Sequence, residues 1–160
     1  MKKIMALLLA VLMMMVMLTG CGNDPVAEDL EKFINTDMVE VNAKYEDLKA
    51  EMNKWDSIKD DQGLIYSIKD NVLPNIEESL ELLSQIEPKT EEVKAIKEKY
   101  KKVLDSYKEG YQGILSALET NEEAAVEEAG KKIDEGVKYL DEYNQALEDL
   151  AKEKDMEVSY

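Results

Sequence analysis

Cysteine is the residue with the most distinctive chemistry in this chain, and it occurs once, at position 21. A single thiol cannot close a disulfide within its own chain, so an exported chain that carries one needs another use for it. Cys21 follows the only long apolar run, Ile4 to Leu18, through the small residues Thr19 and Gly20. This position favours covalent modification of the thiol.

The first 20 residues have the organisation of a secretory signal. Two lysines precede the apolar run, which is shorter than the ~20 residues of a membrane-spanning helix. The residues Leu18 to Cys21, LTGC, match the bacterial lipobox, in which a peptidase cuts before a cysteine whose thiol has been acylated. We predict a lipoprotein signal peptide at 1–20, and a lipidated anchor and short tether at 21–24, with diacylglycerol and fatty acyl chains on Cys21. The alternatives are a plain secretory signal with an incidental thiol and a single-span anchor.

Histidine and arginine are absent from the sequence, in which all 20 basic residues are lysines. Without histidine there is no Ser-His or Cys-His nucleophile pair, no histidine-bearing zinc site and no Glu-x-x-His pair for a di-iron centre. Without arginine, bidentate clamping of phosphate is not possible. We therefore expect no catalytic residues, no metal and no cofactor besides the covalent lipid.

The net charge is −16, and loss of Lys2 and Lys3 with the leader lowers it to −18. Nucleic-acid binding depends on cationic neutralisation of phosphate, so this charge argues against a nucleic-acid partner. The acidic surface has two interpretations, which are solubility and attraction of basic partners or cations in the cell envelope.

Two acidic features resemble metal or catalytic sites but fit them poorly. The stretch Asp56 to Gly63 has the carboxylates of a calcium loop, but Ile58 occupies an expected ligand position and the glycine comes late. The pairs Glu91–Glu92, Glu122–Glu123 and Glu127–Glu128 are expected at helix starts and on solvated faces.

Apolar residues recur at three- and four-residue steps through most of the chain after residue 24, which places them on one face of successive helices. Sustained alternation, the signal of a strand, is absent. Short connections make neighbouring helices antiparallel, so we predict an all-α, up-down-up-down antiparallel four-helix bundle. A long three-helix arrangement with a broken extra helix is the alternative. The bundle is expected at 25–160, with helices at about 25–57, 63–86, 91–119 and 122–154.

Several residues predict where these helices begin or bend. Asp24, followed by proline, should cap the first helix, and Thr90 and Asn121 should cap the third and fourth. Asn35–Asp37 is a weak point through which we expect the first helix to continue. Pro74 lies inside the second helix and predicts a kink just before it.

Glycine occurs inside the third and fourth helices at Gly110, Gly113, Gly130 and Gly136, where each costs ~1 kcal/mol relative to alanine. A hairpin about the connection would set Gly110 opposite Gly130, and Gly136 opposite Leu104. Either the glycines let the helices approach closely, or they open a cleft for a small hydrophobic or sugar-like ligand. The cleft would be lined by Tyr107, Gly110, Tyr111, Gly130 and Tyr139.

The lipobox is followed by GNDPVAEDLEKFIN, and later by VLPNIEESLELLSQIEPKTEEVKAIKEKY and EEAGKKIDEGVKYLDEY. With these segments the chain resembles small helical-bundle lipoproteins of low-GC Gram-positive bacteria. The resemblance covers most of the chain after Cys21 and implies a lipid-anchored protein on the outer face of the cytoplasmic membrane.

These observations predict a non-enzymatic, membrane-anchored extracytoplasmic lipoprotein that acts through protein-protein interaction with an unidentified envelope protein. A bundle that binds a small molecule between the third and fourth helices is the second hypothesis. An enzyme comes last, because its carboxylates, lysines and tyrosines have no recognisable catalytic spacing.

Overall fold

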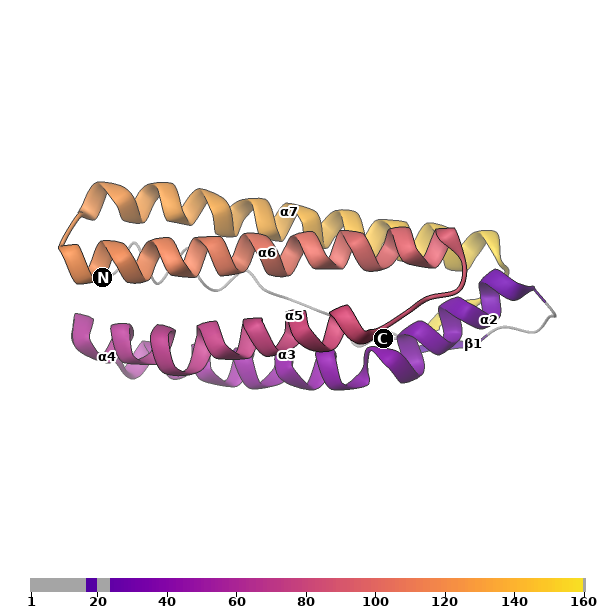
Figure 1. Cartoon of the computed structure of the whole chain (residues 1–160), viewed down its shortest axis with the longest axis horizontal. Helices are drawn as coiled ribbons and strands as arrows, with labels where there is room; N and C mark the ends of the chain where they lie inside the picture. The colour runs from indigo at the N-terminus through magenta and orange to yellow at the C-terminus, as the bar shows by residue number, and fades with distance from the viewer. Residues whose placement is uncertain (1–16, 20–23, 160) are drawn as a thin grey trace.

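The structure is a computed structural model that describes residues 17–19 and 24–159. These residues form an elongated all-α fold in which successive passes of the chain run in opposite directions along the long axis (Figure 1). Helices α6 (Glu91–Thr120) and α7 (Glu123–Glu153) form one layer, and the earlier helices form the other (Figure 1). The predicted all-α class is confirmed, although the described residues contain more α-helices than the four expected.

The first pass is divided where the sequence predicts one helix at 25–57. It comprises α2 (Pro25–Lys32), the π-helical segment η1 (Phe33–Asp37) and α3 (Val39–Met52). The 3-10 segment η2 (Trp55–Ser57) follows. The first pass is therefore helical through the predicted weak point but changes its winding there.

The change of winding in η1 is a single widened turn. The N–H of Met38 donates to the carbonyl of Phe33, five residues back, at 2.9 Å, whereas an α-helix joins residues four apart. Phe33 and Ile34 are buried and Asn35 is exposed. The widened turn thus presents a polar amide beside two core residues.

The second pass comprises α4 (Asp61–Ser67), the π-helical segment η3 (Ile68–Val72) and α5 (Leu73–Gln85). Pro74 has no N–H to donate and its ring would clash with the carbonyl four residues back. A widened turn directly before Pro74 relieves that conflict. The π-helical segment η3 thus lies where the sequence predicts a kink.

The connections on either side of α6 use different caps from those predicted. Asn121 does not cap the fourth helix with its side chain. It ends α6 in the left-handed conformation, with φ 57° and ψ 34°, which asparagine tolerates better than most residues. Thr90 is the N-cap residue of α6, but its side chain accepts no hydrogen bond from the first turn. The Thr90 hydroxyl instead donates to a distant carboxylate, as described below.

Two short strands form an antiparallel ladder, although no strand is predicted from the sequence. Strand β1 (Met17–Thr19) pairs with β2 (Glu157–Ser159), so that Leu18 lies opposite Val158. Residues at opposite ends of the chain make this ladder. Three-residue strands are too short to show a periodic pattern, which explains why the sequence does not predict them.

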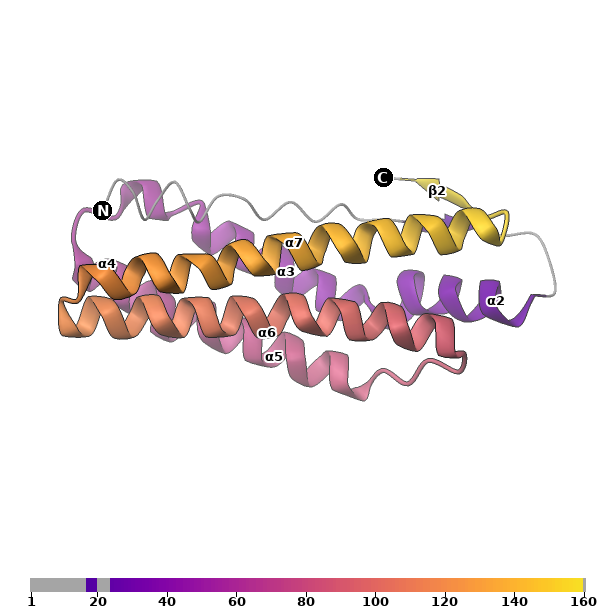
Figure 2. The same ribbon diagram turned by 90° about the horizontal axis from the view of Figure 1, so that it is seen from above.

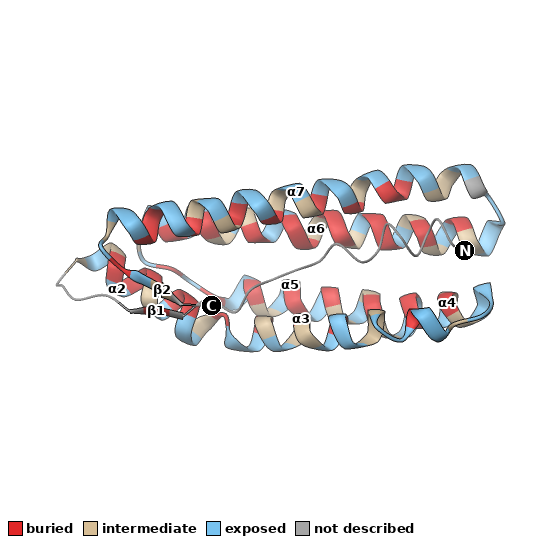
Figure 3. Ribbon diagram, turned by 180° about the vertical axis from the view of Figure 1, so that it is seen from behind, coloured by how far each residue is buried: buried red, intermediate tan, exposed pale blue. Residues whose placement is uncertain are grey.

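The core lies between the two layers, and each helix turns its buried residues inward (Figure 3). Apolar residues at helical spacing supply most of it, as predicted. Among the described residues, no helix combines the length and apolar character that crossing a membrane requires. The buried aromatic residues are Phe33, Tyr45, Trp55, Tyr100, Tyr107, Tyr111 and Tyr143.

Different elements meet at the two ends of the molecule. Both views place the start of α2, the connection between α5 and α6, and the end of α7 together, at what we call the α2 end (Figures 1 and 2). The connection from α3 to α4 and the turn from α6 to α7 form the opposite end, called the α4 end (Figures 1 and 2). The termini of the described helical region therefore meet at the α2 end.

Candidate functional site

The predicted lipidation site, Cys21, lies outside the described residues, and Thr19 and Asp24 are the described residues that flank it. Asp24 is held in place on two sides. Its carboxylate accepts a 2.8 Å hydrogen bond from the N–H of Val26, and it pairs with Lys154 Nζ at 3.2 Å. The hydrogen bond from Val26 and the pairing with Lys154 lower the pKa of Asp24. The chain that follows Cys21 is thus joined to the end of α7.

A buried carboxylate joins α2 to the start of α6 at the same end. Asp29 is 6% exposed, and its Oδ2 accepts hydrogen bonds from the N–H of Lys89 at 2.9 Å and the N–H of Thr90 at 2.8 Å. The Thr90 hydroxyl donates a third bond to the same oxygen at 2.8 Å. Asp29 therefore fixes the two residues directly before α6, and it satisfies the N–H of the N-cap residue, Thr90.

Burial would raise the pKa of Asp29, but the hydrogen bonds from Thr90 and Lys89 outweigh it, so the pKa lies below the ordinary value of 3.8. The group is charged at neutral pH, and its Oδ2 is engaged by Lys89 and Thr90. Its role is structural.

The ladder strand β1 occupies a defined seat at the α2 end. Leu18 has 0% of its surface exposed, and β1 lies against α2, η1 and β2. The side chain of Asn35 holds the backbone of Leu18 on both sides, because its amide oxygen accepts from the Leu18 N–H at 3.1 Å and its amide nitrogen donates to the Leu18 carbonyl at 2.7 Å. This site was not predicted from the sequence, because Leu18 belongs to the segment that we interpret as a leader.

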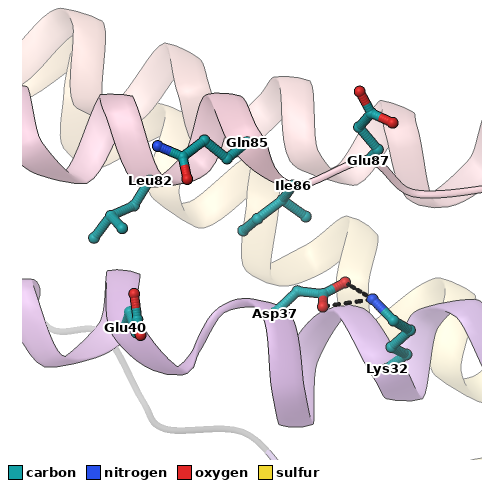
Figure 4. A pocket seen from close by; sticks show the side chains of 7 residues that line it. All are labelled: Lys32, Asp37, Glu40, Leu82, Gln85, Ile86 and Glu87. Atoms are coloured by element: carbon teal, nitrogen blue, oxygen red, sulfur yellow. Dashed lines mark hydrogen bonds and ion pairs between the residues drawn. The ribbon is translucent and has the colours of Figure 1, made fainter.

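A pocket of about 340 Å³ lies between the end of α2, η1, the start of α3 and the end of α5 (Figure 4). Lys32 Nζ pairs with Asp37 Oδ2 at 2.6 Å at its edge, so the ammonium group is neutralised by a carboxylate of the protein (Figure 4). The pocket therefore offers no convergent set of reactive groups. It is lined by Lys32, Asp37, Glu40, Leu82, Gln85, Ile86 and Glu87.

The α4 end carries an open pocket of about 570 Å³ between the start of the second pass and the end of α6. Three carboxylates and one lysine contribute to its wall. Tyr66 on α4 is 63% exposed, which is unusual for a large apolar side chain. The lining residues are Asp60, Asp61, Gln62, Ile65, Lys69, Leu118, Glu119 and Asn121.

Near the α4 end, a chain of hydrogen bonds joins η2 to the second pass. The indole N–H of Trp55 donates to Ser67 Oγ at 2.6 Å, and the Ser67 hydroxyl donates to Glu51 Oε1 at 2.7 Å. Burial would raise the pKa of Glu51, but hydrogen bonds from Lys54 and Ser67 outweigh it and lower the pKa. The chain satisfies a buried indole and fixes the connection between the two passes.

The glycines of α6 and α7 lie at close contacts between the two helices. A Cβ on Gly110 would lie 2.5 Å from Ile133 Cγ1, and a Cβ on Gly113 would lie 2.8 Å from Ala129 Cβ. A Cβ on Gly136 would lie 2.5 Å from the ring of Tyr107. The register is close to the predicted one, because Gly110 meets Ala129 and Ile133, which lie on either side of Gly130, and Gly136 meets Tyr107, three positions from Leu104.

The residues predicted to line a ligand cleft do not gather around one cavity, because Tyr107 lies against Gly136 of α7 whereas Tyr111 packs edge-on against Trp55, with its hydroxyl 3.6 Å from Met52 Sδ. Tyr107 and Tyr111 are 1% and 0% exposed, Gly110 and Gly130 are buried, and Tyr139 is half-buried. Burial raises the pKa of Tyr107 and of Tyr111. The side chains that meet Gly110 and Gly136 fill the space that the glycines leave, which is the behaviour expected from close helix packing.

No protein-family profile matches the sequence, and neither a curated protein nor a solved structure is similar to it. Within residues 17–19 and 24–159, no group of three or more aspartate, glutamate, cysteine or histidine side chains is arranged to hold a metal ion.

Proposed function

We propose that this chain is a lipid-anchored, extracytoplasmic protein that works without catalysis, by binding another protein at the cell envelope. The proposal joins the LTGC motif at Leu18 to Cys21 with the arrangement of the helices. In this proposal residues 1–20 are removed, Cys21 carries the lipid, and the remaining passes act as an up-down-up-down four-helix bundle.

The meeting of the chain's ends at the α2 end carries the proposal. Asp24, three positions after Cys21, is held to Lys154 at 3.2 Å, so the tether leaves the bundle from this end. The α4 end is the far side of an elongated molecule (Figure 2). A lipid on Cys21 would therefore hold the α2 end at the membrane and present the α4 end outward.

The α4 end has the features of a docking surface for a basic protein segment. Asp60, Asp61 and Glu119 surround an open pocket, and the ring of Tyr66 is exposed on the same helix as Asp61. Tyrosine is enriched at protein interfaces because its ring supplies contact area and its hydroxyl remains solvated. Anchoring in two dimensions raises the effective concentration of such a surface toward envelope partners.

A small-molecule cleft between α6 and α7 is not favoured, because Ile133 and Tyr107 occupy the positions that Gly110 and Gly136 leave open.

Photo-crosslinking in native membranes tests the proposal. A photoreactive amino acid replaces Tyr66 at the α4 end or, as a control, Val39, which is 54% exposed on α3. We expect one recurrent protein partner from position 66 and not from position 39, and we expect its loss when Asp60 and Asp61 are both changed to lysine. Well-expressed protein that yields no recurrent partner from position 66 would overturn the interaction.

Lipidation has its own readout. The intact mass of the membrane-extracted protein should match a chain that begins at a lipid-modified Cys21, whereas the Cys21→Ser variant should keep the precursor mass. An unmodified Cys21 in the membrane fraction would refute the anchor.

A further inference from the structure

We infer that the seat of β1, formed by the edge of β2, the amide of Asn35 and the core position of Leu18, is a receptor for an extended peptide segment of another protein. The inference rests on the proposed removal of residues 1–20, which takes β1 away and leaves its seat vacant. The occupant is an extended segment with a leucine-like residue at its centre, because that is what the seat holds in the full chain.

The seat contacts the backbone of the bound segment more than its side chains. Asn35 exchanges two hydrogen bonds, of 3.1 and 2.7 Å, with the N–H and carbonyl of one residue, which is how a neighbouring strand would pair. The other edge of the segment pairs with β2 in antiparallel register, with Leu18 opposite Val158. A segment inserted here therefore has both of its edges satisfied, the arrangement that makes strand addition an effective mode of peptide binding.

Side-chain selectivity comes from a single position. Leu18 is fully buried and belongs to the same apolar core as Leu30, Phe33 and Met156. A charged side chain at that position would be desolvated without a partner, and a small one would leave a cavity. The seat thus selects a leucine-sized apolar residue.

The walls of the seat are held by contacts that do not involve β1. The turn that carries Asn35 is closed by the 2.9 Å hydrogen bond from Met38 to Phe33. The approach to β2 is fixed by a 2.9 Å bond from the N–H of Met156 to the carbonyl of Ala151. Removal of residues 1–20 should therefore leave an open strand edge beside a preformed apolar position, and such edges pair readily with other chains.

The seat lies at the α2 end, beside the tether, so the partner segment must come from a protein at the membrane surface. The net charge, which falls from −16 to −18 when Lys2 and Lys3 are removed, favours a segment with lysine or arginine outside its apolar residue. A second copy of this chain is a less suitable occupant, because its own residues 17–19 are removed in the same step.

The probe is a fluorescent, end-blocked peptide with the sequence of residues 16–20, VMLTG, and its matched control carries aspartate in place of leucine. Fluorescence anisotropy measures its binding to the processed protein extracted from membranes and to the full chain with Cys21→Ala, which keeps β1. We expect saturable binding to the processed protein. The aspartate peptide should bind the processed protein at least about tenfold more weakly than VMLTG does. VMLTG should bind the full chain at least about tenfold more weakly than it binds the processed protein.

The variant Asn35→Ala should weaken binding about tenfold without unfolding the protein, because Asn35 is exposed and the cost falls on two hydrogen bonds to the peptide. Asn53→Ala, an exposed asparagine at the α4 end, is the control and should bind normally. Circular dichroism confirms that both variants are folded.

Three results would overturn the inference. The first is that folded, processed protein does not bind VMLTG, and the second is that it binds the aspartate peptide equally well. The third is that the processed protein sediments as a dimer and that Asn35→Ala makes it a monomer, which would assign the seat to a second copy. Retention of residues 1–20 in the intact mass would instead refute the proposed anchor. In that case the peptide VMLTG is tested on the full chain with Leu18→Asp, because the β1 of this variant cannot occupy the seat. Binding would support the inference, and no binding would overturn it.

Discussion

The substitution Asp29→Ala should destabilise the protein more than any change at an exposed acidic residue of the same helix. Asp29 accepts three hydrogen bonds at one buried oxygen, two of them from the backbone N–H groups of Lys89 and Thr90, directly before α6. An unsatisfied buried donor costs about 1–3 kcal/mol, and bonds to a charged acceptor contribute about 1.5–3 kcal/mol each.

The three bonds share one oxygen, so their contributions do not add in full, and we expect a loss of about 3 kcal/mol. That is a large part of a typical free energy of unfolding of about 5–15 kcal/mol, and it corresponds to a fall in Tm of roughly 10 °C in a domain of this size. Urea unfolding followed by circular dichroism measures the loss. The control is Glu28→Ala, an exposed position beside Asp29.

Acid provides a second test of the same contact. The folded-state pKa of Asp29 is depressed, so its contribution is complete above the ordinary value of 3.8 and is lost as pH falls through the lower folded value. The Asp29→Asn variant has no carboxylate at this position, so its stability lacks this pH-dependent contribution. The difference in free energy of unfolding between the native protein and this variant should therefore shrink below pH 3.8. The reasoning is refuted if Asp29→Ala stays within about 0.5 kcal/mol of Glu28→Ala, the range of ordinary surface changes.

Three further substitutions test contacts between the passes. Ser67→Ala breaks the hydrogen-bond chain between the indole and a carboxylate and should cost about 1–3 kcal/mol, measured by urea unfolding with tryptophan fluorescence, whereas Ser57→Ala on an exposed turn should have little effect. Gly110→Leu places a side chain where the Cβ alone would lie 2.5 Å from the facing helix. It should lower the Tm by several degrees, whereas Ala95→Leu on the exposed face of α6 should not. Tyr107→Phe should leave stability unchanged or raise it by up to about 1 kcal/mol, because this buried hydroxyl has no hydrogen-bond partner among the described residues. A clear loss of stability in that variant would show that the hydroxyl is engaged.

The sequence by itself determined the all-α class and most of the core, because apolar residues at three- and four-residue steps can bury one face only as helices. It also determined the start of α2, since an aspartate before a proline both caps and preorganises a first turn. The effect of Pro74 was likewise local, because the missing N–H and the bulk of the ring act on the preceding turn.

The tertiary structure decided the features that depend on partners far apart in the chain. Asp29 holds Lys89 and Thr90, the residues directly before α6, across 60 residues, a contact that no local pattern encodes, and the Thr90 hydroxyl donates to it and does not cap α6. The close contacts between α6 and α7 depend on how Ile133 and Tyr107 fit against Gly110 and Gly136, which only the packed pair of helices decides.

The seat of β1 shows the same division most clearly. The order of the residues Leu18 to Cys21 is enough by itself to predict a processing motif. That Leu18 also fits a core position, with Asn35 and β2 on either side, arises only when the first and last described residues meet in space. Non-local pairing of this kind depends on the geometry of the whole fold, and the sequence around Leu18 carries no trace of it.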